Sequence, residues 1–337
     1  MTRELSSDLY QKKLLRPGSS KAPIEQSKNN NRRINLIAAL ILTSGLVLAA
    51  IIVLYQPISD YLVLKNADPA MKLLAEQAGM SKEGELIFLR ANPKLATDSQ
   101  MASDCSGNAA ANNKNGFIEQ GCYVPNTHNN SSGNIYIRKM PANLYDQEIV
   151  TASYEMLHSV YFSKNSSNLV MSIESNYNKV RTSSLENQVL NFAKTEPGYR
   201  DLELFSLLGT EFGNLSATLE SYYAPYFSNR ALTIDSYNRV TAIFKNEQAE
   251  LNQLQNTITS DNSLANKAYA DSIAWAKVGN AYEDNYDYGI YKNYIANENT
   301  TINQYNQLSS AYNTLVTEYN GTQPVANIQN ISTQASK

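Results

Sequence analysis

Residues 36–55 form a stretch of 20 residues without a charged side chain, and this stretch constrains the chain more than any other feature. A helix rises about 1.5 Å per residue, so 20 residues roughly match the hydrocarbon core of a bilayer, which is about 30 Å thick. We therefore predict a transmembrane helix over residues 34–55. A signal peptide cleaved near Ala49-Ala50 is the alternative, although a 33-residue polar lead is long for such a peptide.

The charges beside this stretch predict its orientation. Residues 1–33 carry eight Lys and Arg residues against three Asp and Glu residues, and Arg32-Arg33 directly precedes the apolar run. The N-terminus is therefore expected to be a disordered cytoplasmic tail, with the rest of the chain outside the cell membrane. That outer part carries 20 basic and 28 acidic residues, which argues against a nucleic-acid partner. The membrane is the first expected partner.

The chain has only two cysteines, Cys105 and Cys122, and both fall in the part expected outside. Exported cysteine pairs usually form disulfides, so we predict that these two are bonded to each other. Residues 96–134 are dominated by Asn, Ser and Gly, and we expect a long exposed loop there. Metal ligation by the pair with His128 is the alternative, but no second cluster at zinc-finger spacing accompanies it.

Residues 151–161 have the layout of a chemical site. Read as a helix, they place Tyr154 and His158 one turn apart on the same face, with Glu155 beside them. In the motif His-Glu-x-x-His, two histidines at this spacing bind zinc and the glutamate activates the metal-bound water. A tyrosine stands at the first histidine position here, so we interpret Glu155 as a vestigial general base and His158 as a vestigial metal ligand.

The chain around this helix resembles a group of membrane-anchored, zincin-like bacterial proteins. Their helix typically reads Ala-His-Glu-Met-Leu-His, where this chain has Tyr-Glu-Met-Leu-His, and a second helix usually carries Glu-Leu-His-Ser, where this chain has Glu-Leu-Phe-Ser with Phe205. The resemblance covers about residues 67–244. It rests on the order and spacing of further segments at residues 80–88, 121–123, 134–137, 203–211 and 219–227. The resemblance implies a zincin-like fold of the α+β class.

The resemblance also implies a degenerate metal site. Aromatic residues, Tyr154 and Phe205, stand at two of the three expected histidine positions, and one imidazole with carboxylates is a poor zinc site. Glu203 and Glu211 are possible second-shell carboxylates, and zinc is expected as a cofactor only if one of them replaces a lost ligand. We expect the two aromatic rings to fill the space of the metal, so that Tyr154→His and Phe205→His would be needed together to recover zinc binding.

Three functions follow from these patterns. The first is a catalytically inactive binding or scaffold module at the cell surface, with an exported protein or a cell-wall polymer as its partner. The second is a residual zinc metallopeptidase that uses His158, Glu155 and a carboxylate. The third is a structural tether through the C-terminal helices. A Ser/His/Asp or Cys/His catalytic set cannot be argued from spacing, since His128 and His158 are the only histidines.

Residues 56–232 are expected to form the zincin-like domain, mainly helical with a small antiparallel sheet. Residues 117–124 and 134–138 alternate apolar and polar side chains in the manner of a strand pair. The apolar run 84–89 fits either a strand or the end of a helix. Helices are predicted from the apolar spacing over residues 61–80, 167–180, 184–194 and 201–208.

Residues 233–320 change to Asn, Gln, Ala and Tyr at helical spacing. One apolar stripe runs through Ile243, Leu251, Leu254 and Ile258, and another continues at intervals of three and four residues through Tyr305, Leu308, Tyr312, Leu315 and Tyr319. Two or three long helices that fold back as an antiparallel coiled coil or bundle are the simplest account. Residues 321–337 are expected to be a disordered tail. The many tyrosines are interpreted as half-buried, with a saccharide-stacking surface as the alternative.

Overall fold

The computed structural model describes residues 55–105, 120–126, 129–164, 166–183, 185–186, 189–190 and 198–320. Two compact units divide the chain at Asp60/Tyr61. In the first unit, residues 55–60 are described and are helical; the second unit holds all the elements discussed below. Of the predicted transmembrane stretch only Tyr55 is described, and both predicted tails lie outside the described residues. The described helices include none with the length and apolarity needed to cross a bilayer.

The first part of the domain is helical and broken by a proline. Residues 61–66 are helical, and α2 (Pro69–Gln77) follows after a break at which Asp68 accepts a hydrogen bond from the Ala70 N–H. The predicted continuous helix over 61–80 is therefore wrong at this point, because Asp68-Pro69 starts a new helix. The ambiguous run 84–89 lies in a helix, α3 (Lys82–Arg90), which Ser81 caps through the Gly84 N–H.

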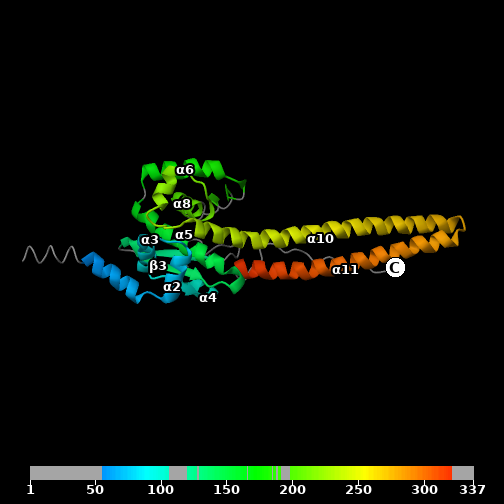
Figure 1. Cartoon of the computed structure of the whole chain (residues 1–337), viewed down its shortest axis with the longest axis horizontal. Helices are drawn as coiled ribbons and strands as arrows, with labels where there is room; N and C mark the ends of the chain where they lie inside the picture. The colour runs from blue at the N-terminus through cyan, green and yellow to red at the C-terminus, as the bar shows by residue number, and fades with distance from the viewer. Residues whose placement is uncertain are drawn as a thin grey trace, which may run out of the picture. The chain divides into compact units, whose positions relative to one another are not determined.

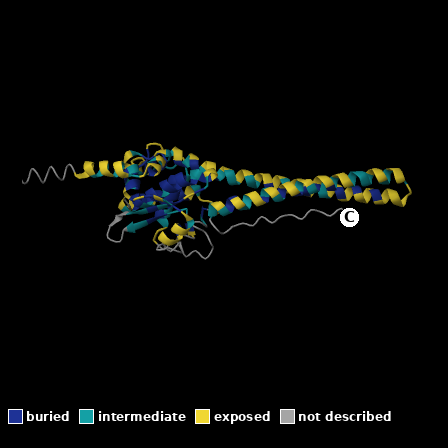
Figure 2. Ribbon diagram, turned by 90° about the horizontal axis from the view of Figure 1, so that it is seen from below, coloured by how far each residue is buried: buried dark blue, intermediate teal, exposed yellow. Residues whose placement is uncertain are grey.

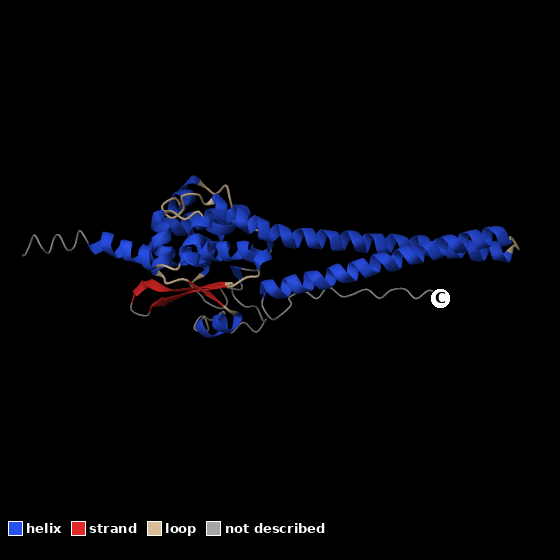
Figure 3. Ribbon diagram, turned by 60° about the horizontal axis from the view of Figure 1, so that its bottom comes forward, coloured by secondary structure: helices blue, strands red, loops and turns tan. Residues whose placement is uncertain are grey.

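A mixed three-stranded sheet covers one side of the domain helices (Figure 3). Strands β2 (Gly121–Asn126) and β3 (Asn129–Arg138) pair antiparallel, as predicted, and β1 (Lys94–Ala96) pairs parallel with β3. The expectation of a purely antiparallel sheet was therefore wrong. The strand β1 was missed because three residues are too few to show a period of two.

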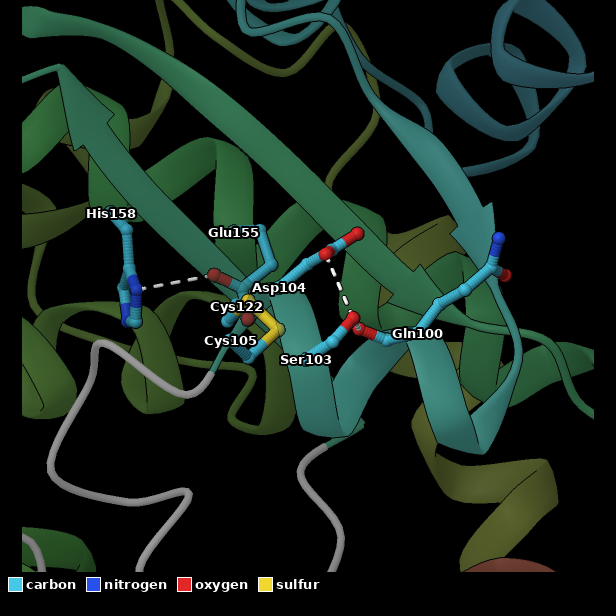
Figure 4. Close-up of a disulfide and its surroundings, with 7 residues drawn as sticks. All are labelled: Gln100, Ser103, Asp104, Cys105, Cys122, Glu155 and His158. Atoms are coloured by element: carbon cyan, nitrogen blue, oxygen red, sulfur yellow. Dashed lines mark hydrogen bonds and ion pairs between the residues drawn. A yellow bond between two sulfur atoms is a disulfide. The ribbon is translucent and has the colours of Figure 1, made fainter.

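The predicted disulfide is present between Cys105 and Cys122, with the Cα atoms 6.0 Å apart (Figure 4). Cys105 follows α4 (Asp98–Asp104), a short helix that starts with a capping box made by Thr97 and Gln100. Met101 of this helix is buried with the two cysteines against the sheet. The described residues around the disulfide thus form a short helix, two strands and a small core, in contrast to the exposed loop expected over residues 96–134. The two sulfur atoms are bonded to each other rather than to a metal.

Helix α5 (Tyr145–Lys164) lies at the centre of the domain and carries the candidate site. It contacts β2 and β3 on one side and α2, α3, α8 and α10 on others, so it is buried around most of its circumference (Figures 1 and 2). Ala152, Met156 and Leu157 are among its fully buried residues. Helix α6 (Ser167–Val180) coincides with its prediction, and α8 (Arg200–Glu211) extends the predicted 201–208 helix by one turn. The predicted helix over 184–194 lies largely outside the described residues.

The chain ends in a helical hairpin. The short helix α9 (Ala217–Tyr223) is followed by α10 (Ala231–Lys277) and α11 (Ala281–Asn320), which run side by side in opposite directions (Figures 1 and 3). The antiparallel prediction is confirmed with two helices, and the first begins two residues before the predicted boundary at 233. Gly279 makes the turn with a φ of +75°, a conformation that favours glycine. Leu251, Ile258, Ile302 and Tyr305 pack in the seam.

Candidate functional site

Helices α5 and α8 bring four of the predicted site residues together. His158 Nδ1 lies 3.3 Å from Glu155 Oε2, and His158 Nε2 lies 3.7 Å from Glu203 Oε2 (the first contact is drawn in Figure 4). The Tyr154 hydroxyl donates a hydrogen bond to the same Oε2 of Glu203. The Tyr154 and His158 rings also contact each other, with centroids 4.7 Å apart. The result is a chain of four polar groups in the order Glu155, His158, Glu203 and Tyr154.

Strand β2 closes this site from the sheet side. Glu155 is only 2% exposed. A Cβ atom added to Gly121 would lie 2.4 Å from Thr151 Cγ2 and 2.9 Å from Glu155 Oε1, so the strand can pass this close only because residue 121 has no side chain. The backbone of Tyr123 provides a hydrogen bond to the Glu155 carboxylate. The glutamate that would activate a metal-bound water in the related motif is here enclosed by protein.

The two carboxylates beside His158 favour the positively charged form of its imidazole. Burial on its own lowers the pKa of His158, but the Glu203 and Glu155 carboxylates beside it outweigh burial and raise that pKa to about 10. Burial raises the pKa of Glu155, and the His158 cation opposes this increase. Burial and the adjacent Glu203 both raise the pKa of Tyr154, so its hydroxyl keeps its proton and remains a donor. The site therefore holds an internal cation between two acids.

These donors do not fit zinc. A histidine ligates a metal through an unprotonated ring nitrogen, and here each ring nitrogen of His158 faces a carboxylate. The two carboxylates lie at opposite nitrogens of the ring and do not converge on one point. Within the part of the chain that the structure describes, no group of three His, Cys, Asp or Glu side chains is arranged to hold a metal ion.

Phe205, the second aromatic residue singled out in the sequence, packs in the core of the domain. Its ring is buried and stacks on Tyr223 with centroids 4.8 Å apart, while Tyr161 lies 5.8 Å away on another side. Tyr154 contacts His158 instead, so among the ring contacts of the described residues none joins Tyr154 to Phe205. The side chain of α8 that faces His158 belongs to Glu203, which lies about 200° from Phe205 around the helix axis. The two rings thus do not stack on each other, although Tyr154 packs against the core cluster that contains Phe205, and the expectation that they share the space of the metal stays a prediction.

Glu211, the second carboxylate singled out in the sequence, lies at the junction between the domain and the hairpin. The Tyr237 hydroxyl of α10 hydrogen-bonds to it, and burial raises the pKa of Glu211 to about 7. Burial and then the Glu211 charge raise the pKa of Tyr319, on α11, to about 12. Glu211 thus faces both hairpin helices, and it acts on the His158 group only from a distance, by helping to raise the pKa of Tyr154.

The same junction contains a buried arginine that the sequence analysis missed. Arg138 ends β3, its Nε lies 2.5 Å from Asp98 Oδ1, and its Nη1 donates to the Tyr319 carbonyl at 2.6 Å. Gln120 Nε2 donates to that carbonyl at 2.5 Å. The carbonyls of the last helical turn lack partners within the helix, so these donors cap α11. The sequence offered one sign of this role, namely that a charged residue directly follows the alternating run Asn134-Ile-Tyr-Ile137.

Comparison of the chain with protein-family models, with curated proteins and with solved structures finds no match. The resemblance to the zincin-like group therefore stays a prediction from the sequence.

Proposed function

We propose that this protein is a membrane-anchored, extracytoplasmic, zincin-like protein that has lost catalysis and acts as a binding or scaffold module at the cell surface. The observation that carries the proposal is the pairing of both His158 ring nitrogens with carboxylates, at 3.3 Å and 3.7 Å. A metallopeptidase needs a metal-bound water beside an ionised general base. Here the general-base position, Glu155, is enclosed and neutralised by the imidazolium.

The substituted site still performs a structural task. In a zincin-like site the metal holds two helices together through its ligands, and here the His158 cation on α5 attracts Glu203 on α8. Tyr154 adds a hydrogen bond to the same carboxylate. The helices thus remain cross-linked by polar contacts, and the domain keeps its packing without requiring a metal.

The hairpin supports the scaffold part of the proposal. Helix α10 has 47 residues, which corresponds to about 70 Å at 1.5 Å per residue. Peptide hydrolysis does not require an appendage of this length, whereas display of a contact surface at a distance does. The role of the hairpin as a tether, the third function considered above, therefore belongs to the same proposal. Exported proteins and cell-wall polymers are the proposed partner classes.

The metal content of the purified protein tests the loss of catalysis. We expect far less than one zinc per chain, measured by elemental analysis after expression with zinc in the medium. About one zinc per chain that disappears in His158→Ala would contradict the proposal and would favour the residual metallopeptidase.

A single substitution sharpens this test. Since Glu203 already faces His158, Tyr154→His would give two imidazoles and one carboxylate, a donor set that catalytic zinc sites use. We expect Tyr154→His alone to raise zinc content towards one per chain, in contrast to the earlier expectation that Phe205 must change as well. Tyr154→Phe is the matched control, because it removes the same hydroxyl without adding a nitrogen. Equal zinc content in the two variants would show that the site geometry proposed here is wrong.

A further inference from the structure

Two acidic residues occupy core positions of the hairpin. Glu298 lies four residues before the buried Ile302 of α11, so its side chain enters the seam with α10, and it is only 1% exposed. On α10, Asp261 follows the buried Ile258 by three residues and precedes the buried Ala265 by four, which places it on the same seam. Acids are rare at such positions, because burial removes the water that stabilises their charge.

A contact nearer the turn shows that the two acids lie close together. Ser272 of α10 donates a hydrogen bond to Asp284 of α11 at 2.6 Å. Eleven residues further from the turn on each helix, Asp261 is level with Ile295, three residues or about 4.5 Å along the axis from Glu298. Because Cα–Cβ bonds tilt towards the N-terminus of their own helix, these two antiparallel side chains lean towards each other. Burial and then the Asp261 charge raise the pKa of Glu298.

The oxygen atoms at this level of the seam lack partners. Glu298 Oε2 and Asn299 Oδ1 are buried, and neither has a hydrogen-bond partner among the described residues. The described residues also show no ion pair with Glu298 or Asp261. The nearest basic residues of the two helices, Lys267 and Lys292, are each six residues away and exposed. Two carboxylates and an amide oxygen thus gather at one place without a side-chain cation to neutralise them.

We propose that this part of the seam binds a calcium ion through the Asp261 and Glu298 carboxylates and the Asn299 amide oxygen. Proteins bind Ca²⁺ through about six to eight oxygen atoms in a flexible arrangement, and carboxylates and amide carbonyls are among its usual ligands. Two carboxylates balance its double charge, and water would supply the remaining oxygens. The third protein ligand is an amide, so the set differs from the groups of three ionisable side chains that are absent from the described residues.

Other metals fit these ligands less well. Zinc favours nitrogen and sulfur ligands, which this part of the seam does not offer among the three side chains named. Magnesium needs near-ideal octahedral geometry and gives up its water reluctantly, whereas side chains from two helices leave the distances adjustable. With only three protein ligands, we expect a dissociation constant of about 10⁻⁴–10⁻³ M, the range of extracellular calcium modules.

The bound ion would change the mechanical character of the hairpin. Without it, two like charges repel each other across the seam; with it, the same two carboxylates join α10 to α11 about midway along their length. This role goes beyond the binding function proposed above and does not depend on the state of His158, so either proposal can fail alone.

Amide hydrogen exchange of the full chain tests the proposal. At about 10 mM CaCl₂ and the expected affinity, amides around Ile258 and Ile302 should exchange about tenfold to a hundredfold more slowly than in a solution with a calcium chelator. Magnesium chloride at the same concentration should have a clearly smaller effect. Sodium chloride at matched ionic strength is the control for charge screening, and an equal effect of sodium would overturn the proposal.

Substitutions locate the site. Glu298→Gln keeps the shape of the side chain and removes its charge, so the hairpin should fold, and we expect calcium to change its exchange by less than twofold. Asp261→Asn should act in the same way. Glu250→Gln is the matched control, because Glu250 is an exposed glutamate of α10 and its loss should leave the full calcium effect. Undiminished protection by calcium in both Glu298→Gln and Asp261→Asn would overturn the proposal.

A proton is the other means of neutralising the two acids. A wild-type seam that gains protection on acidification to about pH 5, yet gains none from calcium at neutral pH, would show that the acids share a proton and would overturn the calcium site.

Discussion

The domain and the hairpin each bury a glutamate, and they accommodate it in different ways. Glu155 in the domain is 2% exposed and lies beside the His158 cation, whereas Glu298 in the hairpin seam is 1% exposed and its pKa is raised by burial and by the nearby Asp261. Among the described residues, neither Glu155 Oε2 nor Glu298 Oε2 has a hydrogen-bond partner, so the two acids differ in the cation that lies beside Glu155. The buried acid of the domain thus has a cation beside it, whereas burial and a second acid act on the buried acid of the hairpin seam. The charge of Glu155 should therefore stabilise the folded protein, whereas the charge of Glu298 should destabilise it.

The largest expected effect is that of removing the counter-charge. His158→Ala would leave Glu155 and Glu203 without the cation between them, and breaking a buried ion pair in this way typically costs about 3–5 kcal/mol. We predict a loss of this order in the free energy of unfolding, measured by urea denaturation with tyrosine fluorescence. The double variant Glu155→Gln with His158→Ala should lose clearly less, because the buried charge is removed as well. An equal loss of unfolding free energy in both variants would show that the ion pair does not stabilise Glu155, and the contrast with Glu298 would then fail.

The His158 imidazolium should also make the stability of the protein depend on pH. The pKa of His158 is about 10 in the folded protein, above the ordinary value of 6.5 expected when unfolded. A raised pKa means that the folded state holds the proton more tightly, so the contribution is complete below pH 6.5 and is lost as the pH rises through about 10. We predict that wild-type stability decreases over this window relative to His158→Gln. Parallel pH profiles for the two proteins would contradict the assignment of a charged His158.

An intermediate effect is expected where the two regions join. Arg138→Ala removes the donor to the Tyr319 carbonyl and leaves Asp98 without its partner, and hydrogen bonds from charged groups contribute about 1.5–3 kcal/mol. We predict faster amide hydrogen exchange in residues 315–320, with little change around Ile258 and Ile302 in the seam. Uniform acceleration along α11 would show that the hairpin has no separate anchor at its end.

The smallest expected effect has the opposite sign. Glu298→Gln keeps the shape of the side chain and removes a buried charge for which the described residues show no ion pair, so we predict a gain in stability of about 1 kcal/mol at neutral pH. Glu250→Gln is the matched control, because Glu250 is an exposed glutamate of the same hairpin and should change stability by less. A loss of stability with Glu298→Gln would mean that this acid has a partner and would remove the contrast with Glu155.

The elements with a clear period could be predicted from the sequence. Helix α6 and the antiparallel hairpin follow from apolar spacing, and the disulfide follows from a lone cysteine pair. The site was predicted only in part. The spacing in α5 correctly placed Tyr154, Glu155 and His158 together, and the helix geometry of α8 showed that Glu203 and Phe205 point in different directions. The rotation of α8 against α5 decides whether the side chain of Glu203 or that of Phe205 lies next to His158. Packing partners far away in the sequence, such as Tyr223, set that rotation.

The attachment of the hairpin also determines how it would carry a mechanical load. Helix α10 continues covalently from the domain, whereas α11 is held at its end by the hydrogen bonds of Arg138 and Gln120 to the Tyr319 carbonyl. A pull on the turn at Gly279 acts along both helix axes, and it loads these two hydrogen bonds together instead of one after the other. If they yield, α11 must slide along α10 and drag Ile302 past Ile258 before the helices separate. The hairpin would thus resist tension by shear, with the yield point set at the edge of the sheet.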